Sequence, residues 1–527
     1  MAVFYYEIKM KDGSRIFSKK EAENGKFSIV ETLPENVLER VWGQIMIPTA
    51  KDEKIFVNGY QSWTHCPEHG PEDSIKGVGK FPKAIVDHYG MDRYGDYYFR
   101  KYPERAGILH GMNYCYFRRG DHYRLVASLD ERPGYTMLTY DSHSQLLNLD
   151  RDCAGVRCGG DFHAFDLFFA EGTEQEVFDA WFEAMGIHAR TQLKLAGYSS
   201  WYNRYENITQ ATILEDLYGC KDKLAPGDIF QVDDGWEPAV GDWLEPDEMK
   251  FSSGMKAIAD EIHKHGLRAG LWLAPFVAAE KSALYRQHPD WLLYMEGKPW
   301  YCGCNWGGFY SLDLDNPEVT CYLEKVFDRV LNEWGYDLVK LDFLYGVAPF
   351  GTAAESRAAR MTRGMEFLRR VCGEKLILGC GVPLMPAFGL VDYCRIGCDV
   401  GLDWDNTLIM RHTNRERVST RHSIENTIFR RQLNGRAFLN DPDVFFLRED
   451  NIKLDARQKK ILGTVNSLFG GVLFHSDNMA AYTGEQDALY TEFLENRSAE
   501  KICVENEKGG LVVNYRVNGK DRKVKVE

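Results

Sequence analysis

The stretch Asp337-Leu-Val-Lys-Leu-Asp-Phe-Leu344 is a short apolar run that carries a lysine and an aspartate two residues apart. Side chains alternate along a strand, so Lys340 and Asp342 are predicted to lie on the same face. A strand this apolar is expected to be buried, and two charged side chains on one buried face are costly unless they lie at the mouth of a site. Asp342 is therefore a candidate catalytic carboxylate. The alternative interpretation is a buried structural Lys–Asp pair.

The residues around this stretch repeat one kind of unit, in which a short apolar run is followed by an amphipathic segment. About eight such β–α units between residues 193 and 498 predict a (β/α)8 TIM barrel. The fifth unit is the weakest, because residues 382–389 are too rich in proline for a proper helix. Strands are predicted near residues 193–199, 228–233, 267–272, 337–342, 376–380, 392–398, 436–440 and 471–476. Helices are predicted near residues 208–223, 253–265, 317–334, 354–372, 417–432 and 455–468.

The segments before and after the barrel are predicted to be β-structure, so the fold class is α/β with an all-β flank. Residues 1–175 contain short alternating runs between turns and no cross-over helices, which predicts an antiparallel β-sandwich. A helical linker covers residues 176–192, since apolar residues have helical spacing from residue 174 onward. Residues 499–527 form a short C-terminal β segment that is too small to bury a core alone. This segment is expected to pack on the barrel or on a partner subunit, and a homo-oligomer stays open.

Composition and charge exclude several classes of partner. The chain has 527 residues and a net charge of −14, which argues against a nucleic-acid or anionic-membrane partner. No window approaches the ~20 apolar residues of a membrane span. The N-terminus lacks the pattern of a signal peptide and the 13 cysteines are scattered, so we expect reduced cysteines and a cytoplasmic protein. Cys302 and Cys304 are the only close pair, and no further ligands follow at metal spacing, so no metal site is predicted.

In a TIM barrel the active site lies at the carboxyl ends of the strands. Each acidic residue found there is, by itself, also consistent with a surface position or a helix N-cap. Carboxylates at the ends of separate strands repel one another, however, and are tolerated where they bind hydroxyl groups, a metal or a developing positive charge. The predicted strand ends carry Trp201, Tyr202, Asp233, Asp234, Trp272, Lys340, Asp342, Cys380, Arg395, Asp399, Asn440, Asp441, Asp443, His475 and Asp477.

Two chemistries fit this ring of carboxylates and aromatic residues. In glycoside hydrolysis one carboxylate acts as the acid and a second as nucleophile or base, and a pair roughly 5 Å apart retains the anomeric configuration. The high aromatic content of 13% suits a surface that stacks on sugar rings. Metal-dependent chemistry with aspartate oxygens as ligands is the second possibility, which the scarcity of histidine at the strand ends weakens.

Seven short motifs that follow one another along the chain resemble those of glycoside hydrolase family 36, the bacterial α-galactosidases. The resemblance extends from about residue 55 to 480. Each motif is weak alone, but their order and spacing make the set specific. The motifs are Asn58-Gly-Tyr-Gln-Ser-Trp63, Gln231-Val-Asp-Asp-Gly-Trp236, Trp272-Leu-Ala-Pro-Phe276, Lys340-Leu-Asp-Phe343, Leu378-Gly-Cys-Gly-Val-Pro383, Arg395-Ile-Gly-Cys-Asp399 and Asn440-Asp-Pro-Asp443.

The resemblance implies a retaining, exo-acting enzyme that needs no cofactor and acts on terminal α-linked galactose of α-galactosides. By this similarity Asp342 corresponds to the nucleophile and Asp399 to the acid/base. Asp233 and Asp234 correspond to the residues that hold the 4- and 6-hydroxyl groups. The remaining correspondences are ring-hydroxyl contacts for Lys340, Cys380 and Arg395, pocket walls for Trp201, Tyr202 and Trp272, and an aromatic side chain from the N-terminal region for Trp63.

Some features depart from the family pattern or leave alternatives open. Cys398 stands where the family usually has proline, and the C-terminal β segment looks shorter than usual. The long connection over residues 274–316 includes Cys302–Trp306, which would lie where the leaving group sits. An α-N-acetylgalactosaminidase or a transglycosylase would share the mechanism. A non-catalytic galactoside-binding protein is the alternative of another class, although such a protein is expected to lack one of Asp342 and Asp399.

Overall fold

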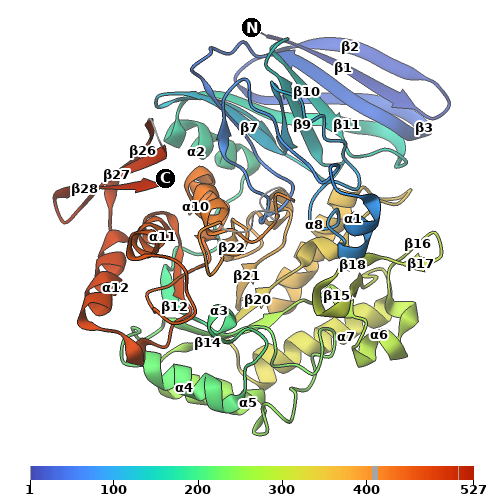
Figure 1. Cartoon of the computed structure of the whole chain (residues 1–527). Helices are drawn as coiled ribbons and strands as arrows, with labels where there is room; N and C mark the ends of the chain where they lie inside the picture. Colours follow the sequence, from blue (N-terminus) through green and yellow to red (C-terminus); the bar gives the residue numbers. More distant parts are fainter. Residues whose placement is uncertain (1, 406–413, 508–509, 527) are drawn as a thin grey trace.

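The computed structural model describes residues 2–405, 414–507 and 510–526, and it places a parallel barrel beside an antiparallel sheet (Figure 1). The barrel strands form one parallel sheet in the order β23-β22-β21-β20-β14-β13-β12-β25-β24. β23 and β24 follow each other directly and share the seventh position, so the predicted TIM barrel is confirmed. The strands are β12 (Leu195–Ser199), β13 (Ile229–Val232), β14 (Arg268–Leu273), β20 (Leu338–Leu341), β21 (Leu376–Gly379), β22 (Tyr393–Arg395), β23 (Leu439–Asp441), β24 (Val444–Phe445) and β25 (Val472–His475).

The six helices predicted from the amphipathic segments lie between these strands, whereas the helices over residues 201–204, 283–287 and 484–496 were not predicted. The unit after β21 has only the short helix α9 (Leu384–Ala387), as its prolines indicated. Capping side chains fix several helix starts, as in α11, where Asp455 and Gln458 form a reciprocal capping box. The other helices of the barrel are α3 (Trp201–Arg204), α4 (Gln210–Cys220), α5 (Gly254–Lys264), α6 (Ala283–Gln287), α7 (Pro317–Asp328), α8 (Arg357–Cys372), α10 (Thr420–Phe429), α11 (Ala456–Phe469) and α12 (Gly484–Asn496).

The N-terminal strands are antiparallel, as predicted, and are linked as a single 11-stranded sheet. The long strands β3 and β11 pair with each other and join its two halves. One apolar core draws side chains from both halves, for example Phe117 of β7 and Tyr140 of β9, whose ring centroids are 4.8 Å apart. The strands are β1 (Ala2–Met10), β2 (Arg15–Ala22), β3 (Gly25–Met46), β4 (Lys54–Val57), β5 (Glu68–His69), β6 (Ile108–Met112), β7 (Tyr114–Arg119), β8 (His122–Ser128), β9 (Thr136–Asp141), β10 (Leu146–Arg151) and β11 (Arg157–Thr173).

Helix α2 (Glu174–Met185) joins the antiparallel sheet to the barrel. Its Trp181 is fully buried, packs against Tyr114 of the sheet and Phe388 of the barrel, and donates a hydrogen bond to the carbonyl of Ser128. Sheet and barrel therefore share one continuous apolar core.

A loop of the N-terminal region reaches over the barrel and carries the short helix α1 (Lys83–Tyr89). Gln61 forms a β-bridge with Pro383, and the amide of Ser62 donates to the carbonyl of Val382 at 2.9 Å. Arg430, just after α10, is fully buried and donates to the carbonyls of Gln61 and Ser62. These bonds hold residues 58–63 against the ends of the barrel strands.

Three smaller β-sheets complete the described part of the chain. The connection after β14 contains the sheet β15 (Val277–Ala279), β19 (Phe309–Ser311) and β18 (Tyr301–Gly303), and the hairpin β16 (Tyr294–Met295) and β17 (Lys298–Pro299). The C-terminal strands β26 (Glu500–Glu507), β27 (Gly510–Val517) and β28 (Lys520–Val526) form an antiparallel sheet. Val513 and Val526 of this sheet are buried in the barrel core, so the segment packs on the barrel as expected. Within the described residues, none of the helices has the length and apolar character needed to cross a bilayer.

Candidate active site

A cavity of about 700 Å³ opens at the carboxyl ends of the barrel strands. Residues from the barrel, from the N-terminal loop and from the connection after β14 line it together, so the site is assembled from three parts of the chain. The lining residues are Trp63, Phe81, Ile85, Tyr89, Met91, Tyr94, Trp201, Glu206, Asp233, Asp234, Trp272, Cys304, Asn305, Trp306, Lys340, Asp342, Phe343, Asp399, Asn414, Glu416, Arg417 and Val418.

Asp342 lies directly after β20, on the cavity wall and otherwise buried. The amide of Phe343 donates to its Oδ1 at 2.8 Å, and Trp272 Nε1 donates to its Oδ2 at 3.2 Å. Burial raises the pKa of Asp342, while the nearby Lys340 ammonium opposes that rise and Asp399 adds to it. Phe343 has a left-handed backbone (φ +52°), a strained conformation that turns the chain out of the strand just behind the carboxylate.

Lys340 and Asp233 form a buried ion pair across neighbouring parts of the wall. Lys340 Nζ lies 2.8 Å from Asp233 Oδ2, which also accepts hydrogen bonds from Gln231 and Ser199. Burial disfavours the Lys340 ammonium, but the Asp233 and Asp342 carboxylates outweigh it, so the pKa of Lys340 is raised. Lys340 is therefore charged and places a positive charge between two carboxylates.

Asp399 is held at the cavity by the guanidinium of Arg395. Arg395 Nη1 lies 2.8 Å from Asp399 Oδ1, and its other nitrogens pair with Asp441 and Asp443. Tyr202 donates to Asp443 from behind. Burial raises the pKa of Asp443 to about 6, against the effect of Arg395. The Asp399 side chain is 38% exposed, whereas that of Arg395 is buried, so Asp399 faces the cavity and Arg395 lies behind it.

Asp234 lies beside a second buried acid, Glu237. Burial raises the pKa of Asp234 to about 6 and, together with the Asp234 charge, raises that of Glu237 well above its usual value. Trp306 Nε1 donates to Asp234 Oδ2 at 2.8 Å, which ties the connection after β14 to the floor of the cavity.

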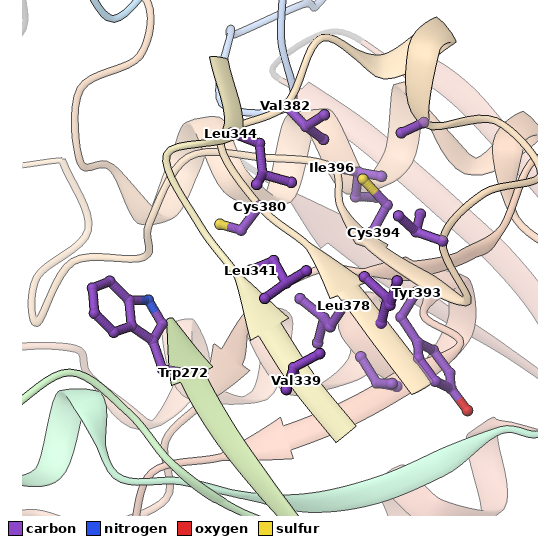
Figure 2. Close-up of a cluster of buried hydrophobic side chains, with 14 of the residues drawn as sticks. Trp272, Val339, Leu341, Leu344, Leu378, Cys380, Val382, Tyr393, Cys394 and Ile396 are labelled. Carbon is purple, nitrogen blue, oxygen red and sulfur yellow. The ribbon is translucent and has the colours of Figure 1, made fainter. Parts of the chain in front are cut away.

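Cys380 and Trp63 connect the N-terminal loop to the end of β21. Trp63 Nε1 lies 3.3 Å from Cys380 Sγ, and the Trp63 ring packs edge-on against Phe343. In the close-up of the barrel core, the thiol of Cys380 points toward the side on which Trp272 lies, while Leu378 fills the interior (Figure 2). Gly381 has a positive φ of 56°, and a Cβ there would lie 2.9 Å from the Trp63 ring, so this position requires glycine.

The residues predicted from the sequence divide into two groups. Trp63, Trp201, Asp233, Asp234, Trp272, Lys340, Asp342 and Asp399 line the cavity. Tyr202, Cys380 and Arg395 are not among the lining residues and lie one contact behind it, against Asp443, Trp63 and Asp399. Sequence reasoning gave no role to Phe343, Tyr94, Glu206 or the residues of α1. Phe343 lies within the motif Lys340–Phe343, whereas the others lie outside the predicted strand ends.

Among the described residues, no three or more His, Cys, Asp or Glu side chains are grouped so that they could hold a metal ion. The carboxylates of the cavity instead have cationic or N–H partners from the protein: Lys340 for Asp233, Trp272 for Asp342, and Arg395 for Asp399.

Comparison with known proteins adds independent evidence. Residues 198–370 match the Melibiase family. The α-galactosidase of Escherichia coli is 33% identical over 147 residues, which cover 27% of this chain and 20% of that enzyme. The match thus spans about a fifth of the length of this curated relative.

Solved structures extend the similarity to nearly the whole chain. An α-galactosidase from Thermus thermophilus in complex with p-nitrophenyl α-D-galactopyranoside superposes with a TM-score of 0.73 at 26% identity, and the match covers 94% of this chain and 98% of that one. A family 36 α-galactosidase from Geobacillus stearothermophilus shares the fold, with a TM-score of 0.60 at 13% identity over 97% of this chain and 80% of the other. These similarities confirm the predicted resemblance to the family 36 α-galactosidases.

Proposed function

We propose that this chain is a retaining, exo-acting α-galactosidase that cleaves terminal α-linked galactose by double displacement. The observation that carries the proposal is the placement of Asp342 and Asp399 on one cavity, each with a different environment. Asp342 is buried and faces Lys340, whereas Asp399 is partly exposed and rests on Arg395. Two carboxyl groups in unlike environments suit the two roles that glycoside hydrolysis needs.

In the first step the Asp342 carboxylate attacks the anomeric carbon while Asp399 gives a proton to the glycosidic oxygen. The Phe343 amide and the Trp272 indole donate to Asp342, and Lys340 supports its negative charge. The leaving group departs and a β-linked galactosyl ester on Asp342 remains. In the second step Asp399 takes a proton from water, which attacks the same carbon and releases galactose with its original α configuration.

The wall formed by Asp233 and Asp234 supplies the selectivity for galactose in this proposal. Lys340 donates to Asp233 and Trp306 donates to Asp234, and both carboxylates line the cavity. A carboxylate accepts hydrogen bonds in a fixed geometry, which suits the axial 4-hydroxyl and the 6-hydroxyl of galactose. The similar Thermus enzyme holds p-nitrophenyl α-D-galactopyranoside, which supports an α-galactoside as substrate here.

Initial rates on a matched set of nitrophenyl glycosides test the proposal. The set contains the α-galactoside, its 2-acetamido counterpart and the α-glucoside, each with and without a chelator. We expect turnover of the α-galactoside, unchanged by chelator, and little turnover of the α-glucoside. Preference for the 2-acetamido sugar would keep the mechanism and change the substrate. Loss of activity with chelator would contradict the metal-independent mechanism, and failure to cleave any of the three would contradict the enzyme proposal.

A further inference from the structure

The outer part of the cavity is apolar and open to solvent. Ile85, Tyr89 and Val418 line the cavity, and each is a large apolar residue with 42%, 51% and 57% of its surface exposed. Phe81 and Met91 lie on the same lining. Exposed apolar side chains gathered at one place mark a binding surface more often than scattered ones do. This surface is continuous with the cavity that Asp342 and Asp399 line. It is therefore placed to contact the leaving group of a substrate.

Helix α1 supplies one side of this mouth and is fixed in place. Ile85 and Tyr89 are four residues apart and therefore lie on one face of the helix, while Val86 is buried and anchors the other face. The helix ends at Gly90, where φ is +58° and a Cβ would lie 2.8 Å from the backbone of Gly303. The end of α1 thus packs tightly on β18, which lies beside it in Figure 1.

Several polar side chains at the mouth are already engaged within the protein. Glu416 accepts hydrogen bonds from Thr64 and Tyr97. Arg417 is paired with Asp405 at 2.6 Å, and its side chain is buried. Glu416 and Arg417 thus already have partners within the protein, whereas Ile85, Tyr89 and Val418 on the same lining offer exposed apolar surface.

We propose that the leaving-group site of this chain takes an apolar aglycone, an alkyl chain or an aromatic ring, in preference to a further sugar. The inference rests on the proposed α-galactosidase function and deepens it. A sugar in this position needs hydrogen-bond partners, which the aliphatic side chains of Ile85 and Val418 do not provide. An alkyl or aryl group would instead cover the exposed apolar surface and remove it from water.

The test compares kcat/KM for α-galactosyl fluoride, methyl α-galactoside, n-octyl α-galactoside below its micelle concentration, and the disaccharide melibiose. We expect the octyl substrate to exceed both methyl α-galactoside and melibiose by roughly tenfold or more. In Ile85→Asn and Val418→Asn, the ratio of kcat/KM for the octyl substrate to that for the fluoride should fall about tenfold. Lys83→Asn, on the same helix but away from the lining, is the matched control and should keep the wild-type ratio.

The four substrates separate failure of this inference from failure of the function. Turnover of the fluoride without a preference for the octyl substrate would overturn the apolar aglycone and leave the α-galactosidase intact. Absence of turnover of the fluoride, which has no organic aglycone, would overturn the function itself. If Ile85→Asn changes the mass measured by light scattering but not the substrate ratio, a second copy covers this surface and the inference is wrong.

Discussion

Asp342 combines burial, which disfavours its charge, with three neighbours that stabilise it. The Phe343 amide, the Trp272 indole and the Lys340 ammonium all favour the ionised form, and the ionised form is the one that can attack. Asp399 has a different partner, Arg395, and faces the open cavity. Truncation of Asp342 and truncation of Asp399 should therefore have different effects on the reaction.

Asp342→Ala is expected to lower kcat on nitrophenyl α-galactoside by roughly 10⁴-fold or more, because no ester can form. Added azide should restore part of the rate by entering the vacated space, and the product should be β-galactosyl azide. Asp399→Ala with azide should give α-galactosyl azide instead, because azide then attacks the ester on Asp342. The anomeric configuration of the azide product, determined by NMR for each variant, tests both expectations. An Asp342→Ala variant of wild-type rate, or the same azide anomer from both variants, would contradict the assignment.

The charged residues of the site were predictable from the sequence, but not all of the side chains that contact them were. Lys340 and Asp342 were found because charge inside an apolar strand is conspicuous. Trp306, which donates to Asp234, comes from a long connection whose path no local pattern fixes, so only the position of its segment near the leaving group was predicted. Tyr202 follows a strand like the wall residues, yet the first turn of α3 directs it to Asp443, behind the cavity.

Among the elements, the loop over residues 58–63 is held in part by one buried cation, Arg430. Arg430 donates to Asn58 Oδ1 at 3.1 Å and to the carbonyls of Gln61, Ser62 and Ile396. It thereby fixes the loop that carries Trp63 to the barrel. The loop would lose these bonds together if the guanidinium were removed.

Arg430→Met should lower the free energy of unfolding by about 3 kcal/mol, because several buried acceptors lose their donor. It should also lower kcat/KM, since Trp63 is no longer held over Cys380. Urea denaturation and initial rates measure the two effects. Arg370→Met, which removes one partner of the exposed ion pair with Glu324, is the control and should cost under ~1 kcal/mol. Equal losses for the two variants would contradict the role of Arg430.

Glu416, at the contact between the N-terminal loop and the barrel, should make stability depend on pH. Burial raises its pKa to about 7 in the folded chain from a usual 4.5. The folded state therefore holds a proton that the unfolded state has lost, and this stabilising contribution is full below pH 4.5 and declines as the pH rises to 7.

Between pH 5 and 8 the free energy of unfolding of the wild type should fall by about 2 kcal/mol more than that of Glu416→Gln. Chemical denaturation at several pH values measures this difference. Glu374→Gln removes a 95% exposed carboxylate and serves as control, with the wild-type pH dependence expected. Parallel curves for the wild type and Glu416→Gln would show that Glu416 is ionised across the range.

The barrel elements were predictable because each strand or helix has its own periodic pattern of apolar residues. The strand before Asp399 is shorter than predicted, ending at Arg395, because the chain turns there to bring Asp399 to the cavity. Helix α1 was not predicted, since its seven residues carry one buried side chain and no side-chain N-cap. The rest of the fold places α1 at the mouth of the cavity, where Ile85 and Tyr89 line it.

For the whole molecule, the active site requires the N-terminal region as well as the barrel. Trp63 enters the cavity from a loop that belongs to the antiparallel sheet, and Trp306 enters from the connection after β14. The joining of that sheet through β3 and β11 depends on pairing between residues far apart in sequence, which no local pattern reveals. The cytoplasmic location and the oligomeric state stay predictions from the sequence.

The stereochemical course of the reaction tests whether the chain cleaves α-galactosides with retention. Proton NMR of nitrophenyl α-galactoside during hydrolysis by the wild-type chain shows which anomer of galactose forms first. We expect α-galactose as the first product, followed by its slow conversion to the β anomer. Formation of β-galactose first would mean a single displacement and would contradict the role of Asp342 as nucleophile.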